Sequence, residues 1–297
     1  MIGAAPRKPV GNRFRDIDSK VIPILVRLLR PIRCLVRVAI QSGEGPNMQR
    51  LPKVLEREPL VDAIFEVRLN GTSPLGDILP GALFGGITPK PIVERLPAAE
   101  FPYPIRANDP NLQFAPVSRL DLGQYHISVS DRSFFISCKL PYPKWPAFKE
   151  KIVEITRQIA SFGIPGSVER YSIKYVNLIE APSLDEQISK VNLSLKLGSL
   201  NNIDSNVNLR LERNNGETLH IVSIVTGAQG VLADGRSLFG VVVDIDSIRN
   251  VRFESFNAFA DIVENGVEEL RQANKAQFFD CLKEEAVQAM GPVYESN

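Results

Sequence analysis

Two carboxylates stand close together after an apolar run, Asp244 and Asp246 in the stretch VVVDIDS. Residues i and i+2 of a strand point to the same face, a few ångströms apart. Such a pair can hold a divalent cation, and similar pairs recur where magnesium bridges a triphosphate. One alternative is therefore a magnesium-dependent nucleotide or phosphoryl-transfer enzyme, with a third carboxylate from another strand, Glu212 or Glu180. The competing interpretation is that both aspartates end a strand at a solvated edge.

A second candidate group is Lys174, Tyr175 and Asn177, in the stretch ERYSIKYVNLIE. On a strand, Tyr175 and Asn177 share one face, whereas Lys174 lies on the other. The polar face could bind an anion or a peptide. The alternative is structural, with Asn fixing a bulge or turn and Lys covering the sheet with its aliphatic stem.

Other catalytic and cofactor signatures are missing from the sequence. His126 and His220 lie among apolar neighbours, and no Ser or Cys stands at a recognisable nucleophile spacing from them. The cysteines Cys34, Cys138 and Cys281 are too dispersed for a disulfide framework or a four-cysteine zinc site. No GxGxxG, GxxxxGK[ST], HExxH or CxxC motif occurs. We therefore expect no evident cofactor, with Mg²⁺ only under the enzyme alternative.

The elements that position these residues are mostly strands. Residues 60–69 alternate apolar and polar side chains, which predicts a half-buried strand. Three further strands are expected within 116–140, and another over 167–180. Residues 145–162 show helical spacing of Phe148, Ile152, Ile155 and Ile159, ended by Gly163.

The second half partly repeats this order. Strands are expected over 191–197, 206–213, 217–227 and 237–248, with Asn214-Asn215-Gly216 as a hairpin turn. Ser255 is a plausible N-cap for a terminal helix, which Gly266 would bend and which would pause near Asn274. Strands, a central helix, then strands and terminal helices predict an α+β fold with mainly antiparallel sheet. Two related halves, 48–180 and 181–297, are a further expectation.

The first 47 residues differ from the rest in charge. They hold nine Lys or Arg and three Asp or Glu, so their net charge is +6, and the chain's net charge of +1 leaves −5 for the remainder. One interpretation is a basic amphipathic segment at a membrane surface. Another is a disordered tail. The third is that translation starts at Met48, because the codons for Gly43-Glu44-Gly45 can contain a ribosome-binding sequence.

Composition excludes several classes of protein. With 44% hydrophobic and 23% charged residues in 297, the chain matches a globular protein with a sizeable core. Nucleic-acid binding is not favoured, because the body is acidic and its basic residues are interspersed with acids. Tyr142, Lys144, Trp145 and Lys149 form a small basic-aromatic patch that is more typical of helix packing.

Three segments resemble an uncharacterised, sporadically distributed bacterial family of about 250 residues. They are EPLVDAIFEVRL, ERYSIKYVNLIE, and FGVVVDIDS followed by ELRQANKAQFFDCL. The resemblance covers Leu51 to about Met290, and Lys174 stands where arginine is usual. It implies a bacterial and cytoplasmic setting and no established reaction.

Residues 71–116 form a long segment without a regular pattern of apolar residues. Its repeated Pro and Gly permit only short helices or extended pieces, and so long an irregular stretch is often functional. We therefore expect a binding or interaction module without evident catalysis, which recognises a protein partner or small ligand through its sheet and this rim. Nothing in the sequence excludes an oligomer.

Overall fold

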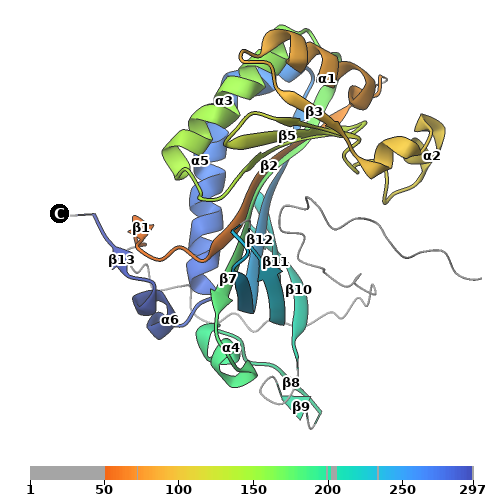
Figure 1. The fold of residues 1–297 in the computed structure, drawn as a ribbon. Helices are drawn as coiled ribbons and strands as arrows, with labels where there is room; N and C mark the ends of the chain where they lie inside the picture. Colours follow the sequence, from red (N-terminus) through yellow and green to blue (C-terminus); the bar gives the residue numbers. More distant parts are fainter. Residues whose placement is uncertain (1–50, 72, 199, 202–205, 233, 296–297) are drawn as a thin grey trace, which may run out of the picture.

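In the described part of the chain, nine antiparallel strands form one sheet in the order β10–β11–β12–β7–β2–β6–β5–β4–β3 (Figure 1). The structure is a computed structural model that describes residues 51–71, 73–198, 200–201, 206–232 and 234–295. The leader 1–47 and its basic segment lie outside the described residues. The fold is α+β with a mainly antiparallel sheet, which confirms the predicted class.

The strands of this sheet vary in length from four to seventeen residues. They are β2 (Leu60–Asn70), β3 (Ile92–Arg95), β4 (Ser118–Asp121), β5 (Tyr125–Val129), β6 (Ser133–Cys138), β7 (Ser167–Glu180), β10 (Asn208–Asn215), β11 (Thr218–Val231) and β12 (Ser237–Phe253). Two short pairs lie outside it, namely β1 (Val54–Leu55) with β13 (Pro292–Val293) and β8 (Lys196–Leu197) with β9 (Leu200–Asn201).

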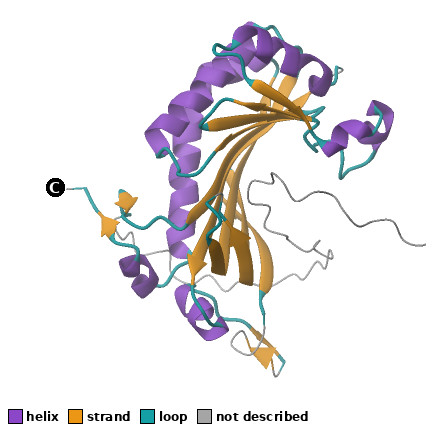
Figure 2. Ribbon diagram, in the orientation of Figure 1, coloured by secondary structure: helices purple, strands orange, loops and turns teal. Residues whose placement is uncertain are grey.

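Two helices, α3 (Trp145–Ser161) and α5 (Phe256–Asp280), lie along the same face of the sheet (Figures 1 and 2). We call it the helix face and the opposite one the far face. The remaining helices are α1 (Leu75–Gly86), α2 (Tyr103–Asn108), α4 (Leu184–Lys190), α6 (Glu284–Ala289) and the 3₁₀ turn η1 (Pro97–Glu100).

The main core fills the helix face, because the period-two strands and the apolar stripes of the helices meet there. Phe65 of β2, Phe134 of β6, Phe148 of α3 and Phe259 of α5 are all fully buried in it. Each such side chain contributes roughly 1.5–3 kcal/mol relative to an exposed one. Helix α5 thus packs on β7 and β12, and α3 packs beside α5.

The two expected halves share this sheet. Strand β12, from the second half, pairs with β7 of the first along nearly its whole length, and β2 pairs with the other edge of β7. The central three strands therefore join segments that are far apart in sequence, from 60 positions between Glu180 and Gly240 to 117 between Leu60 and Asn177. Whether the halves are related stays a prediction.

Several local expectations fit and others fail. Strand β7 has the predicted bounds, and the Ser255 hydroxyl accepts a hydrogen bond from the Ala258 amide as an N-cap. The strand expected over 191–197 is wrong. Instead, Ser183 caps α4 just before it, and only Lys196 and Leu197 form a short strand.

Helix α5 also runs without the expected pause. The Asn274 amide donates hydrogen bonds to the carbonyl oxygens of Ile173 and Ile245, so this helix turn is attached to the sheet. Gly266 lies inside α5, against β7. A larger residue does not fit at this position, because a Cβ would stand 2.7 Å from the Tyr171 hydroxyl oxygen. Here glycine permits close packing of helix on strand.

Candidate functional site

Asp244 and Asp246 both lie on the far face, as their spacing predicts. Across β12, Asp246 is opposite Lys174 of β7, and Asp62 of β2 is opposite Val176, the partner of Asp244. The Lys174 ammonium lies 2.8 Å from Asp244 Oδ2. We call Asp62, Lys174, Asp244 and Asp246 the carboxylate cluster.

The third carboxylate that acts on Asp244 and Lys174 is neither Glu212 nor Glu180, the two that the sequence suggested, but Asp62. Glu212 of β10 lies in the same cross-strand row as Asp246, two strands away, and pairs with Arg210, whereas Glu180 pairs with Arg236. Asp62 takes this place because β2 lies beside β7. Its polar position in an alternating strand was visible in the sequence, but the register that aligns it was not.

Burial dominates the electrostatics of the cluster. It raises the pKa of Asp62 from 3.8 to about 6, against the opposing effects of the Ala63 amide and Lys174. It also raises the pKa of Asp244 and Asp246, whereas Lys174 acts to lower both. Burial acts to lower the pKa of Lys174. The negative charges of Asp244, Asp246 and Asp62 outweigh this effect, so the pKa of Lys174 is raised overall. Lys174 thus lies among three carboxylates whose ionisation burial opposes, and Arg210 and Arg170 act with it on Asp244 and Asp246 respectively.

Next to the cluster on the far face, the Glu66 carboxylate is paired with two arginines. Glu66 accepts hydrogen bonds from Arg68 and Arg170, at 2.8 and 2.9 Å. By contrast, Asp244 Oδ1 and Asp246 Oδ1 are buried and lack a hydrogen-bond partner among the described residues. Arg170 Nε, beside Glu66, lacks a partner in the described part of the chain as well, so the unsatisfied polar atoms extend from the cluster to its neighbour on the same face.

The three aspartates of the cluster are not grouped as the ligands of a metal ion. Within the described residues, no three or more His, Cys, Asp or Glu side chains are grouped so that they could hold a metal ion. The Lys174 ammonium already lies against the carboxylate that a cation would need. Phosphoryl transfer with Mg²⁺ stays a prediction, and the described residues offer no set of ligands for the ion.

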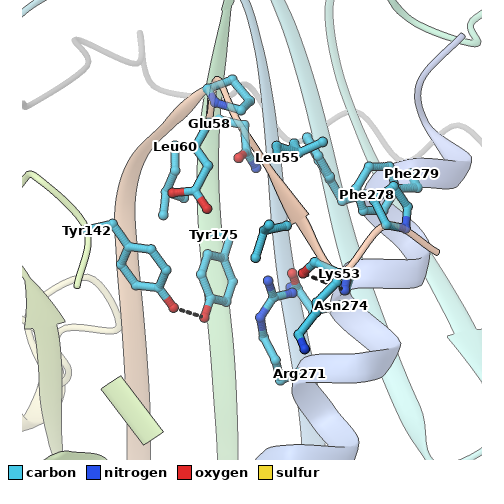
Figure 3. A pocket seen from close by; sticks show the side chains of 15 residues that line it. Lys53, Leu55, Glu58, Leu60, Tyr142, Tyr175, Arg271, Asn274, Phe278 and Phe279 are labelled. Carbon is cyan, nitrogen blue, oxygen red and sulfur yellow. Dashed lines mark hydrogen bonds between the residues drawn. The ribbon is translucent and has the colours of Figure 1, made fainter. Parts of the chain in front are cut away.

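Tyr175 and Asn177 lie on the helix face, so they belong to a different place from Lys174. Both line a cleft between residues 52–60, β7 and α5 (Figure 3). The Asn177 amide donates to the Val243 carbonyl at 3.3 Å, which ties β7 to β12. The Tyr175 hydroxyl is 2.9 Å from that of Tyr142. The three sequence candidates therefore do not form one site.

One histidine has a serine neighbour that sequence spacing did not reveal. His220 Nδ1 lies 2.8 Å from Ser247 Oγ, because β11 and β12 pair these residues across the sheet. Both side chains are buried, and Asn274 also donates to Ser247 at 2.9 Å. Burial lowers the pKa of His220. A substrate cannot reach this pair, which acts as a structural link.

The proline-rich segment ends the sheet and exposes apolar side chains. Strand β3 is the last in the sheet order, and all four of its residues are exposed. Seven large apolar side chains are exposed along the sequence segment 78–105, which contains this strand. We call them the apolar rim: Ile78, Phe84, Ile92, Val93, Phe101, Tyr103 and Ile105.

A buried ion pair holds part of this rim in place. Arg106 of α2 contacts both carboxylate oxygens of Asp131, at 2.7 and 2.9 Å, in the turn between β5 and β6. The Arg106 side chain also donates to the Phe101 carbonyl. Helix α2 is therefore attached to the sheet although much of its surface is exposed.

Comparison with known proteins gives no further guide. No protein-family model matches the chain, and no curated protein sequence matches it either. The resemblance to a bacterial family stays an expectation. Among the described helices, none combines the length and apolar character needed to span a membrane. Membrane-surface attachment through the leader concerns residues outside the described part.

Proposed function

We propose that the chain is a non-catalytic interaction module that accepts an extended segment of a partner protein along the free edge of β3. Its setting is the cytoplasm, as the family resemblance implies. The observation that carries the proposal is the exposure of Ile92 and Val93, at 75% and 47%, on the last strand of the sheet.

An edge strand presents backbone N–H and C=O groups that can pair with another strand. Soluble proteins usually protect such edges with charge or cover, because an apolar edge invites association. In β3 the two charged residues are occupied within the chain. Glu94 pairs with Arg119, and Arg95 donates to the Ala99 carbonyl. The free side chains of the edge are therefore the apolar ones.

The neighbouring apolar rim supports the same reading. Isolated exposed apolar residues are normal on protein surfaces, but contiguous ones are typical of interaction sites, and Ile92 and Val93 are neighbours in β3. The Arg106–Asp131 pair holds α2 in position before any partner arrives, which reduces the ordering cost of binding.

Deleting residues 81–110 would remove the β3 edge, but it would also remove the buried side chains of Leu83 and Arg106 and so disturb the fold. A double substitution, Ile92→Lys with Val93→Lys, changes only exposed positions. We expect it to weaken partner binding at least about tenfold, since lysines on an edge oppose strand addition. The matched control is Val231→Lys, an exposed apolar residue at the end of β11.

The partner is identified with a photo-crosslinking amino acid at position 92, or at 231 as a control, in the full chain expressed in its host. The proposal expects one heterologous protein attached at 92 and absent at 231. Loss of that partner from the double variant, with retention by the control, supports it. An adduct only between two copies of this chain, or unchanged partner recovery by the double variant, contradicts it.

A further inference from the structure

The cleft on the helix face is separate from the β3 edge and has the size of a small-molecule site. Its inner part, of about 80 Å³, is lined by Tyr175 and Asn274. Its outer part, of about 410 Å³, is lined by Trp145 and Gln272. Lys53, Tyr142 and Arg271 belong to both, so the parts adjoin. Ligand pockets usually measure roughly 300–1,000 Å³.

Two cations line this cleft, and within the described ranges neither has a carboxylate partner. Arg271 and Lys275 are one helical turn apart on α5, and both face the cleft. Among the described residues, neither makes an ion pair within 4.0 Å. Lys275 donates instead to the Lys53 carbonyl at 3.3 Å. Arg271 Nε is buried without a hydrogen-bond partner. No carboxylate of the described residues therefore contacts either cation directly.

The carboxylates that line the cleft are already engaged. Glu58 pairs with Lys144 at 2.8 Å, and Glu295 pairs with Lys53 at 3.3 Å. Burial and the nearby Arg271 charge lower the pKa of Lys275, although Glu295 and Glu268 oppose the shift. An anion that entered the cleft would relieve this repulsion.

Aromatic rings form the walls beside the cations. The Arg271 guanidinium lies 4.4 Å from the Tyr175 ring centroid and 5.9 Å from that of Trp145. Figure 3 shows Arg271 reaching from α5 toward Tyr175, whose hydroxyl meets that of Tyr142. Phe278 and Phe279 add apolar surface on the α5 side. A ring can pack on these walls while its acidic group meets the cations.

We propose that this cleft binds a small aromatic anion, with its carboxylate or phosphate between Arg271 and Lys275 and its ring against Tyr142 and Trp145. Guanidinium and ammonium groups both pair with either acid, and the aromatic walls select a ring over a bare ion. This site is independent of partner binding at β3.

The single tryptophan of the chain makes binding directly observable, because Trp145 lines the outer part of the cleft. The full chain is titrated with phenyl phosphate, benzoate, inorganic phosphate and the neutral analogue benzamide, and Trp fluorescence is recorded. We expect a saturable change with phenyl phosphate, benzoate or both, and none with benzamide. The acid that gives the change identifies the class of ligand.

Two variants test the assigned cations. Arg271→Gln and Lys275→Gln should each weaken binding at least about tenfold, which is the loss of one charge-assisted contact. Lys283→Gln, an exposed lysine that does not line the cleft, should bind as the unaltered chain does. Far-ultraviolet circular dichroism checks that each variant is folded.

Three results would overturn the proposal. They are no saturable change with either aryl anion, equal binding of inorganic phosphate and phenyl phosphate, and undiminished binding by both folded glutamine variants. The second result would show that the aromatic walls do not contribute.

Discussion

We expect that removing the charge of Asp62 from the carboxylate cluster stabilises the protein at pH 8. Asp62 has a pKa raised to about 6 by burial, so the folded state holds its proton more tightly than the unfolded chain, where the pKa is 3.8. Between these two values the folded state binds more protons. The free energy of unfolding therefore falls as pH rises through this window, and the loss is complete above it.

The size of the effect follows from the shift. About two pKa units at 1.36 kcal/mol each give an upper limit of about 3 kcal/mol. Because the charges of Lys174 and Asp244 also act on the pKa of Asp62, in opposite directions, we expect about 1–3 kcal/mol. Asp62→Asn cannot ionise, so it should exceed the unaltered chain in stability by this amount at pH 8. Near pH 4 the difference should disappear.

Urea unfolding followed by circular dichroism from pH 4 to pH 8 measures this difference. Asp261→Asn, which removes an exposed carboxylate on α5, is the matched control and should follow the unaltered chain. The reasoning is refuted if Asp62→Asn is no more stable at pH 8, or if its gain is the same at both ends of the range. A constant gain would show that packing, and not ionisation, is responsible.

Three other predictions concern the core, the rim and the metal hypothesis. Gly266→Ala should destabilise the protein by about 1–3 kcal/mol in urea unfolding despite better helix propensity, because its Cβ meets the Tyr171 hydroxyl, and Tyr171→Phe should restore part of the loss. Arg106→Leu should cost about 3–5 kcal/mol in the same assay, since it leaves Asp131 buried and unpaired; a loss below 1 kcal/mol would contradict a well-buried pair. Magnesium with a nucleoside triphosphate should leave the Tm of the chain unchanged; a rise that Asp246→Asn abolishes would instead restore the enzyme alternative.

Part of the candidate chemistry was readable from sequence because it depends on local geometry. Alternation along a strand places Asp244 and Asp246 on one face and separates Lys174 from Tyr175, whatever the strand pairs with. The α+β class and the bounds of β7 follow from the same period-two pattern. Capping of α5 by Ser255 is equally local, since it needs only a hydroxyl before the first helical turn.

Other features needed the tertiary structure, because they join side chains across strand registers and helix packing. Asp62 meets Asp244 only because β2 and β12 flank β7, and His220 meets Ser247 only through the β11–β12 register. Arg271 meets the Tyr175 ring only because α5 packs over β7.

By itself, the sequence determined which residues share a strand face, where the principal helices begin, and that the fold is α+β. Only the tertiary structure decided which faces meet. Propensity and alternation act over a few residues, whereas register and packing are set by the burial of apolar surface between distant segments. For that reason the carboxylate cluster, the aromatic cleft and the exposed edge of β3 emerge only when the sheet is assembled.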